Sequence, residues 1–301
     1  MALKVFFIGA SKFGAKCLET CLSLNDVEVV GLLTAKENFN ISYSANGVRN
    51  YNHFDFKHYS YKINGPVLTL KDKMNDSDLL EIVREINPDC FLVSGWYHMI
   101  PRSWRLIAPA YGLHASLLPK YSGGAPLVWA MINGEKKTGI SLFQMDDGVD
   151  SGAIYGKEEV EIRDDDTIAT LYKRVEMLGV ELLRRVLPTL ADGSASYYIQ
   201  DESERSTFPQ RSPRDGLIEW DKSAEEIDRF IRAQTQPYPG AFFYFGEKKV
   251  TVWKASIGKL SLKPGAIGYC CGFSYVGCAD GSLKLEIIEV DGEKHTSLVV
   301  F

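Results

Sequence analysis

The sequence predicts an α/β protein of two domains, in which a domain with a mostly parallel β-sheet is followed by a smaller β-rich domain. Three observations support this prediction. Apolar strand-like segments alternate with amphipathic helix-like segments in the first part of the chain. Short strand-like segments separated by turns make up the last part. The 301 residues also exceed roughly 250, above which single cores usually stop growing, so two cores are expected.

The chain opens with a strand, a turn and a helix. Residues 3–8 form an apolar run that is typical of a buried strand, and a second such run follows at residues 27–33. Gly9 and Gly14 surround the start of the intervening helix, whose apolar residues share one face. This order predicts a Rossmann-like β-turn-α unit.

A second helix is expected to begin at Ser77 as its N-cap and to stop at Asn87-Pro88, just before a strand at residues 91–94. Alternation of strands and helices predicts parallel pairing. Ligands of such sheets bind beyond the carboxyl ends of the strands, where residues 95–100 would lie.

Two further segments have different patterns. Residues 35–66 are rich in Asn, Tyr, Ser and His and predict a long loop or small insertion. The aromatic residues of this predicted loop either cover a substrate or pack on the sheet edge. They are Tyr43, Tyr51, His53, Phe54, Phe56 and Tyr59. Residues 167–187 carry apolar side chains at steps of three and four behind an acidic cluster, which predicts an amphipathic helix.

The second domain is expected after a polar stretch. Ser223 and Glu226 have the spacing of a capping box, and short strands with turns at Gly246, Gly272 and Gly281 follow. This pattern suits either a barrel or a sandwich. The predicted organisation is a first domain over residues 1–192, a linker over 193–213 and a β-rich domain over 214–301.

Composition restricts the classes of function. Apolar residues at 45% and aromatic residues at 12% are typical of a globular protein. The net charge of -5 removes the long-range attraction to phosphate backbones, so nucleic acid is not expected as a partner. The first residues resemble a buried strand more than a signal peptide, and no run approaches the roughly 20 apolar residues of a membrane span. We therefore expect a soluble, cytoplasmic protein.

The six cysteines lie in apolar or strand-like contexts without a paired CxxC motif. This usage is typical of reduced thiols in a cytoplasm and does not predict a metal site.

His114 and Asp150 are the candidate proton-transfer groups. His114 ends a short apolar run, and Asp150 follows the strand-like residues 140–145. A lone histidine in an apolar strand is more often a satisfied core residue. An imidazole and a carboxylate at neighbouring strand ends, however, can transfer protons in one cleft. Between them lies a loop whose proline stiffens the turn and whose glycines allow a ligand to approach closely.

The residues around this pair follow an ordered motif. It comprises Gly112, His114, Ser116, Leu117, Leu118, Pro119, Gly123, Ala125, Pro126, Asp150 and Gly152. Further matches are Asn133-Gly134-Glu135, Thr138-Gly139, Arg211, Asp215-Gly216, Glu219-Trp220, Ile231-Arg232-Ala233 and residues 237–241. The pattern resembles the 10-formyltetrahydrofolate-dependent formyltransferases, and it spans most of the chain. It is most similar to the sugar N-formyltransferases.

The resemblance implies a formyl-transferring enzyme with N10-formyltetrahydrofolate as donor, no metal, and an OB-like second domain. It implies that His114 is the general base or proton shuttle and that Asp150 orients it and stabilises its protonated form. The residues that it places at the folate are Trp96, Tyr97, His98, Met99, Ile100, Ser116, Leu117, Leu118, Pro119, Met145, Asp146, Asp147 and Gly148. Those that it places at the acceptor are Lys120, Tyr121, Ser122 and Gly123. Trp96 and Tyr97 also suit plain core packing.

Two positions depart from the family pattern. Gly112 stands where the family has an asparagine whose side-chain amide donates to the developing oxyanion. Three explanations remain open. A backbone N–H, a water or a neighbouring side chain such as Tyr111 or His98 replaces this donor, or the enzyme is slow. In the third, the chain binds folate without turnover. Ser122 stands where related enzymes often carry a basic residue, and Lys120 is the remaining cation of this loop.

The family uses several acceptors, and the acidic chain disfavours transfer RNA. The expected substrate is a nucleotide-linked amino-deoxysugar, whose product serves glycan biosynthesis, and a homodimer is possible. The alternatives are a methionyl-tRNA formyltransferase and a catalytically impaired folate-binding protein. A nucleotide-dependent oxidoreductase is a weaker alternative, because Gly9 and Gly14 do not complete the GxGxxG motif.

Overall fold

The computed structural model describes residues 2–41, 44–71 and 73–296, and its contacts divide the chain into two compact units. The first unit comprises Met1–Gly123, Gly139–Val160 and Arg174–Thr207. The second comprises Gly124–Thr138, Glu161–Lys173 and Phe208–Phe301. The second unit therefore includes stretches that the sequence analysis assigns to the first domain. The boundaries at residues 192 and 213 remain predictions.

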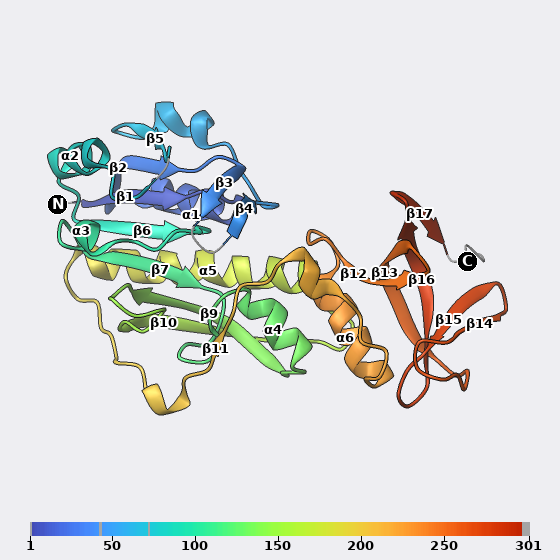
Figure 1. Cartoon of the computed structure of the whole chain (residues 1–301). Helices are drawn as coiled ribbons and strands as arrows, with labels where there is room; N and C mark the ends of the chain where they lie inside the picture. Colours follow the sequence, from blue (N-terminus) through green and yellow to red (C-terminus); the bar gives the residue numbers. More distant parts are fainter. Residues whose placement is uncertain (1, 42–43, 72, 297–301) are drawn as a thin grey trace. The chain divides into compact units, whose positions relative to one another are not determined.

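The first unit contains the expected, mostly parallel sheet (Figure 1). Its strands are β1 (Leu3–Gly9), β2 (Val27–Thr34), β5 (Val67–Thr69), β6 (Cys90–Ser94), β7 (Ala110–His114), β9 (Lys137–Gln144) and β10 (Ile154–Glu161). They are ordered β10-β9-β7-β6-β1-β2-β5. The pairs from β7 to β5 are parallel, whereas β9 runs antiparallel to β7. The carboxyl end of β7 and the loop after β6 consequently lie at one edge of the sheet.

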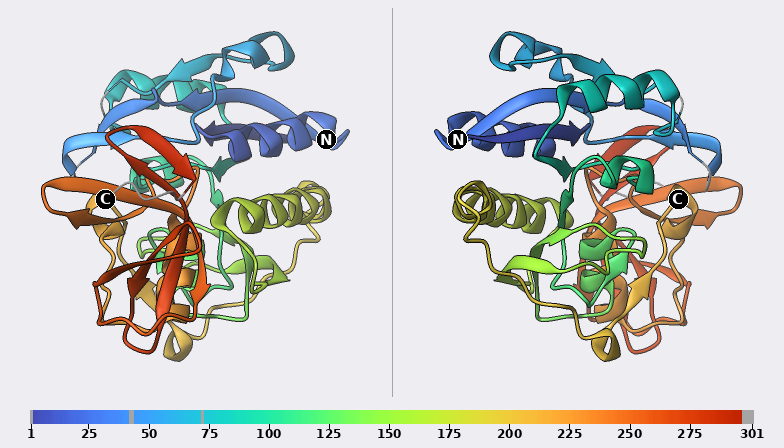
Figure 2. Two further views of the ribbon diagram at one scale, coloured as in Figure 1. Left: turned by 90° about the vertical axis from the view of Figure 1, so that its right-hand side faces the viewer. Right: turned by 90° about the vertical axis from the view of Figure 1, so that its left-hand side faces the viewer.

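Helices cover both faces of this sheet (Figure 2). They are α1 (Lys12–Ser23), α2 (Ser77–Ile86), α3 (Arg102–Arg105) and α5 (Ile168–Ala191). On one face, Val83 of α2 and Trp104 of α3 are buried in a cluster with Phe6 of β1. On the other face, α1 packs against β1, β2 and β6 and is joined to α5 by an ion pair between Lys16 and Glu176 at 2.6 Å. Alternate residues of the strands are thus buried on opposite faces.

The ends of the helices follow from local sequence, with two corrections. The N-cap of α2 is Asp76 and not Ser77, because the Asp76 carboxylate accepts a hydrogen bond from the Leu79 N–H at 3.0 Å. The helix ends as predicted, at a left-handed Asn87 before proline. Helix α5 begins near the predicted residue but continues to Ala191, so that Pro188 lies inside it.

Residues 35–66 form more regular structure than expected. They contain the antiparallel hairpin β3 (Asn38–Ile41) and β4 (Ser44–Arg49) and the 3-10 helix η1 (Phe56–Lys62). Phe56 is fully buried and its ring lies 6.1 Å from that of Phe7 in β1, and Tyr59 is 8% exposed. These two aromatic residues therefore pack on the sheet rather than cover a substrate. Tyr43, which belonged to the same prediction, lies outside the described residues.

The second unit contains an antiparallel sheet, in agreement with the predicted β-rich domain. Its strands are β12 (Ala241–Phe245), β13 (Lys248–Gly258), β14 (Ile267–Cys270), β15 (Phe273–Gly277), β16 (Ser282–Val290) and β17 (Glu293–Thr296). The order is β12-β13-β16-β15-β14, and β17 also pairs with β16. Its helical elements are α4 (Pro126–Ile132), the 3-10 helix η3 (Pro213–Gly216) and α6 (Ala224–Gln234).

Helix α6 begins with the predicted capping box, in which the Glu226 N–H donates to Ser223 Oγ and the Ser223 N–H donates to Glu226 Oε2. Its apolar face, with Ile227 and Ile231, packs into the core of the antiparallel sheet. That this sheet is OB-like remains a prediction.

The stretch predicted as a linker, residues 193–213, contains short regular elements. It contains the 3-10 helix η2 (Glu202–Glu204) and β11 (Thr207–Phe208), which pairs with β8 (Ser122–Gly123). Over the described ranges, no helix is both long and apolar enough to cross a membrane.

Candidate active site

His114 is the last residue of β7, at the carboxyl end of the parallel part of the sheet. Its side chain is 11% exposed, and its Nε2 lies 2.8 Å from the Tyr121 carbonyl oxygen. Because a carbonyl oxygen only accepts, Nε2 carries the hydrogen of this contact. The Tyr121 carbonyl therefore sets the orientation of the imidazole and leaves Nδ1 as the nitrogen that can exchange a proton.

Asp150 is brought next to this nitrogen from the loop after β9. Its Oδ2 lies 3.5 Å from His114 Nδ1 and accepts a hydrogen bond from the Gly123 N–H at 2.8 Å. Its side chain is 21% exposed, and its backbone has a φ of 52°, which is uncommon for a residue other than glycine. The distance to the ring is too long for a strong hydrogen bond, so the pair has room to tighten when a ligand binds.

Gly112 lies in the middle of β7, between Val93 of β6 and Phe143 of β9. A Cβ at this position would overlap the Met145 Cε methyl group and would lie 3.3 Å from Phe143 Cε1. Met145 thus takes the space in which a side chain of residue 112 would begin. A side chain at residue 112 would therefore need Met145 to move.

The side chains suggested as replacements for that amide have different surroundings. Tyr111 is buried, its ring lies 5.0 Å from that of Tyr155, and burial together with the Tyr155 hydrogen bond raises the pKa of its phenol. Successive residues of a strand point to opposite faces, so Tyr111 points away from the face of Gly112.

The loop after His114 is held by internal hydrogen bonds. The Ser116 hydroxyl donates to the Lys120 carbonyl oxygen at 2.7 Å, and the Leu118 N–H donates to Ser141 Oγ at 3.1 Å. Lys157 donates to the Leu118 carbonyl oxygen at 2.9 Å. The Leu118–Pro119 peptide bond is cis. Ser116 and Leu118 are fully buried, so their side chains shape the loop, whereas Lys120 is exposed.

Residues 95–100, which follow β6, contain aromatic side chains whose rings lie close together. The ring of His98 lies 5.4 Å from that of Trp96 and 5.2 Å from that of Phe39 in β3. Trp96 Nε1 and His98 Nε2 are both buried without a hydrogen-bond partner. Tyr97 belongs to the same group, because its ring lies 5.3 Å from that of Phe39 and its hydroxyl donates to Asn50 Oδ1 at 3.3 Å. Met99 and Ile100 do not belong to it, since Met99 is 63% exposed and Ile100 is buried in the core. Two unsatisfied ring nitrogens at the carboxyl edge of a sheet are expected where a polar ligand binds.

Burial lowers the pKa of His98 from its usual value of 6.5. The unfolded chain therefore binds more protons than the folded protein as the pH falls below about 6.5. The contribution of neutral His98 to stability is present above this pH and is lost as the pH falls toward the lowered pKa. We expect the melting temperature of the wild type to fall more between about pH 7.5 and about pH 5.5 than that of His98→Phe.

Differential scanning fluorimetry at the two pH values measures this difference. His58→Phe, at an exposed histidine of η1, is the matched control and should follow the wild type. Equal pH dependence of His98→Phe and the wild type would contradict the assignment.

The acidic loop after β9 has two different parts. Asp146 Oδ1 accepts hydrogen bonds from the Gly148 N–H at 3.0 Å and from the Ser151 hydroxyl at 2.6 Å, which shapes the loop. Asp147 is exposed and forms an ion pair with Arg105, which lowers the pKa of its carboxyl group. Met145 packs against a buried cluster that includes Phe143.

Two residues near the pair were not among those predicted. The amide of Gln200 and the guanidinium of Arg205 contact the loops that carry Asp150 and Ser122. Both residues come from the polar stretch that looked like a linker, where no local pattern distinguishes them. No group of three or more His, Cys, Asp or Glu side chains that could hold a metal ion occurs in the part of the chain that the structure describes.

Solved structures share this fold at low identity. HypX from Aquifex aeolicus in complex with tetrahydrofolic acid matches with a TM-score of 0.66 and 17% identity, over 99% of this chain and 46% of HypX. This chain thus spans about half the length of HypX. The N-formyltransferase from Helicobacter canadensis, in complex with folinic acid and dTDP-3-aminofucose, matches with a TM-score of 0.67 and 16% identity, over 97% and 100% of the two chains. Methionyl-tRNA formyltransferase from Clostridium thermocellum matches with a TM-score of 0.58 and 22% identity, over 85% and 94%.

Family models assign the sequence more directly. The formyl transferase model matches residues 2–187, and the model of the formyl transferase C-terminal domain matches residues 211–301. Together they include the β7 end, the Asp150 loop and the antiparallel sheet. The chain belongs to the formyl transferase family.

Proposed function

We propose that this protein moves a formyl group from N10-formyltetrahydrofolate to the primary amine of a nucleotide-linked amino-deoxysugar. The observation that carries the proposal is the pairing of His114 with Asp150 at the carboxyl end of β7. Membership of the formyl transferase family supplies the reaction class. A dTDP-linked amino sugar occurs in the Helicobacter canadensis structure, and the net charge of -5 disfavours a transfer RNA acceptor.

The segment 95–100 and the aromatic side chains around it fit a flat, polar heterocycle such as the pterin of the donor. Trp96 and His98 offer ring faces together with two ring nitrogens that have no partner. The donor would supply the activated formyl carbon. The remaining folate contacts proposed for this chain come from residues 116–119 and 145–148.

The proton steps fall to His114 and Asp150. His114 Nδ1 accepts a proton from the attacking amine, and the adjacent Asp150 carboxylate stabilises the imidazolium that results. The acceptor nitrogen adds to the formyl carbon, so that negative charge develops on the formyl oxygen, before the bond from that carbon to the folate nitrogen breaks. His114 then returns the proton to the leaving nitrogen, so that charge and atoms balance. The loop residues 120–123 are proposed to contact the acceptor.

The proposal is tested by incubating the protein and the folate donor with a panel of nucleotide-linked amino sugars and with charged methionyl-tRNA. Intact-mass analysis of each acceptor detects an added formyl group. We expect at least one amino-sugar nucleotide to be formylated, and His114→Ala to remove this activity. Formylation of the transfer RNA alone would replace the proposed acceptor. Donor binding without a single turnover on any acceptor would instead indicate an impaired folate-binding protein.

A further inference from the structure

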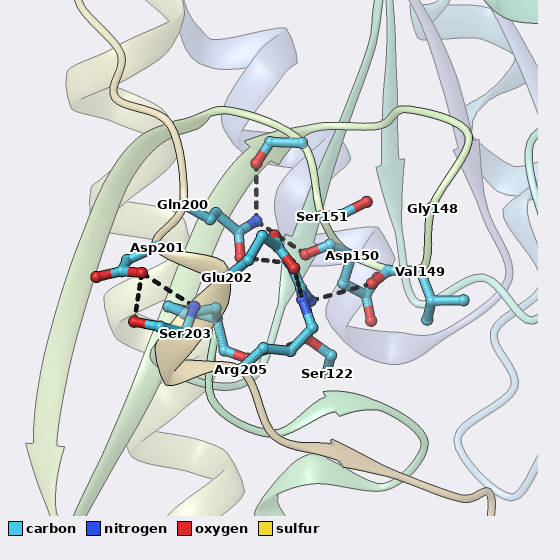
Figure 3. A network of polar contacts seen from close by, with 12 residues as sticks. Ser122, Gly148, Val149, Asp150, Ser151, Gln200, Asp201, Glu202, Ser203 and Arg205 are labelled. Atoms are coloured by element: carbon cyan, nitrogen blue, oxygen red, sulfur yellow. Dashed lines mark hydrogen bonds and ion pairs between the residues drawn. The ribbon is translucent and has the colours of Figure 1, made fainter.

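Residues 198–206, here called the strap, run along the loops that carry Asp150 and Ser122 (Figure 3). At one end, the Ile154 N–H donates to the Tyr198 carbonyl oxygen at 2.9 Å, and the Tyr198 N–H donates back at 3.0 Å. At the other end, the Ser122 N–H donates to the Ser206 carbonyl oxygen at 2.9 Å, and the Tyr121 N–H donates to Ser206 Oγ at 2.9 Å. The strap is therefore tied at one end to the strand that follows the Asp150 loop and at the other end to the loop that contains Tyr121 and Ser122.

Gln200 holds the backbone of this loop directly. Its side chain is buried, at 5% exposure, and its Nε2 donates to the carbonyl oxygens of Asp150 at 2.8 Å and Gly152 at 2.7 Å. Asp150 has a left-handed backbone conformation, which costs free energy unless surrounding contacts stabilise it. The two hydrogen bonds from one amide supply such contacts on either side of Ser151.

Arg205 joins the Asp150 loop to the loop that contacts the Asp150 carboxylate. Its Nη1 donates to Ser122 Oγ at 2.5 Å and to the Val149 carbonyl oxygen at 3.3 Å, and its Nη2 donates to Gln200 Oε1 at 3.2 Å. Ser122 precedes Gly123, whose N–H donates to the Asp150 carboxylate. Val149 precedes Asp150. The guanidinium thus links the two residues that precede the donor and the acceptor of the hydrogen bond that orients the carboxylate.

The charge of Arg205 is balanced within the strap. Glu202 accepts two hydrogen bonds from the guanidinium, from Nε at 2.5 Å and from Nη2 at 2.6 Å, and the Arg205 side chain is 17% exposed. A paired and largely buried arginine suits a fixed scaffold better than a mobile ligand contact. It also brings a cation to Ser122, the position at which the sequence lacks a basic residue.

We propose that Gln200 and Arg205 are positioning residues that set the carboxylate of Asp150 against His114, so that the strap is part of the active site. This inference rests on the proposed function for the roles of His114 and Asp150. A strap that only connected parts of the fold would leave the His114 imidazole unaffected. The positioning role instead predicts a change at this imidazole when either side chain is altered.

The first measurement is the nuclear magnetic resonance signal of the histidine ring nitrogens. The chain has five histidines, and His114→Gln assigns the His114 signals by their loss. We expect Gln200→Met and Arg205→Met to shift the His114 signals in the direction of Asp150→Asn. Arg185→Met is the matched control, because Arg185 also forms a 2.5 Å ion pair with a glutamate but makes it with Glu158 on β10. It should leave the His114 signals at their wild-type positions.

The second measurement is turnover with an accepted amino-sugar nucleotide. We expect kcat to fall roughly ten- to a hundredfold in Gln200→Met and Arg205→Met, because small misplacements of catalytic groups have effects of this size. KM for the folate donor should change less than about threefold. Arg205→Lys keeps the charge beside Glu202 but cannot make the same fork of contacts, so it should be intermediate. It also serves as the test if Arg205→Met does not fold.

The outcomes separate this inference from the proposed function. His114 signals and kcat that match the wild type in all folded strap variants would overturn the inference while turnover continued. Shifted His114 signals in a protein that formylates no amino sugar would support the positioning role and overturn only the proposed acceptor.

Discussion

Replacement of His114 by alanine is expected to lower kcat by roughly 10² to 10⁴, because the variant loses the group that exchanges the amine proton. Asp150→Asn should have a similar effect. It keeps the size of the side chain and a hydrogen-bond acceptor for the Gly123 N–H but removes the negative charge 3.5 Å from His114 Nδ1. Steady-state formylation rates measure both losses.

Folate binding separates this loss of chemistry from a loss of structure. Calorimetric titration with a reduced folate should give an affinity within a few fold of the wild type for both variants. His58→Ala removes an exposed histidine of η1 and should leave kcat unchanged. Wild-type turnover in both His114→Ala and Asp150→Asn would refute the assigned roles.

Gly112→Asn is the second substitution with a large expected effect, and we expect it to reduce stability. The new side chain would start where the Met145 Cε methyl group lies and would also approach Phe143 Cε1. Overfilling a packed site of this kind typically costs about 1 to 3 kcal/mol. Denaturant unfolding measures the loss, and Gly112→Asn combined with Met145→Ala should recover most of it.

The same pair of substitutions tests whether an asparagine amide at residue 112 can act as the oxyanion donor. A correctly placed oxyanion donor contributes about 2.7 to 4 kcal/mol to transition-state stabilisation. The double variant should therefore turn over faster than Met145→Ala alone if the asparagine reaches the oxyanion. An undiminished stability of Gly112→Asn would show that Met145 does not restrict this position. A slower double variant would show that the site is arranged around the glycine.

Much of the first unit follows from local patterns. The strands β1, β2 and β6 each extend one residue beyond the predicted apolar run, and Asn87 before proline ends α2 as expected. The capping box of Ser223 and Glu226 is present. Such features depend on residues within about four positions of one another, so the sequence displays them directly.

Other features of the fold have weak local signals. The N-cap of α2 is Asp76 and not the predicted Ser77, because both side chains are able to cap a helix and the backbone conformation decides which of them does. The hairpin of β3 and β4 was missed because its residues alternate poorly between apolar and polar. The antiparallel direction of β9 was not predicted, since pairing partners that are distant in sequence determine it.

In the candidate site, too, some features follow from the sequence and others depend on the tertiary structure. By itself, the sequence predicted which groups carry the chemistry, because the motif around His114 and Asp150 is ordered along the chain and resembles that of one family. Only the tertiary structure decided how these groups are held. The Tyr121 carbonyl orients the imidazole, Met145 fills the space beside Gly112, and Gln200 reaches Asp150 from 50 residues away. The polar side chains of the strap bond to partners that are distant in the sequence, and therefore no local spacing encodes those contacts.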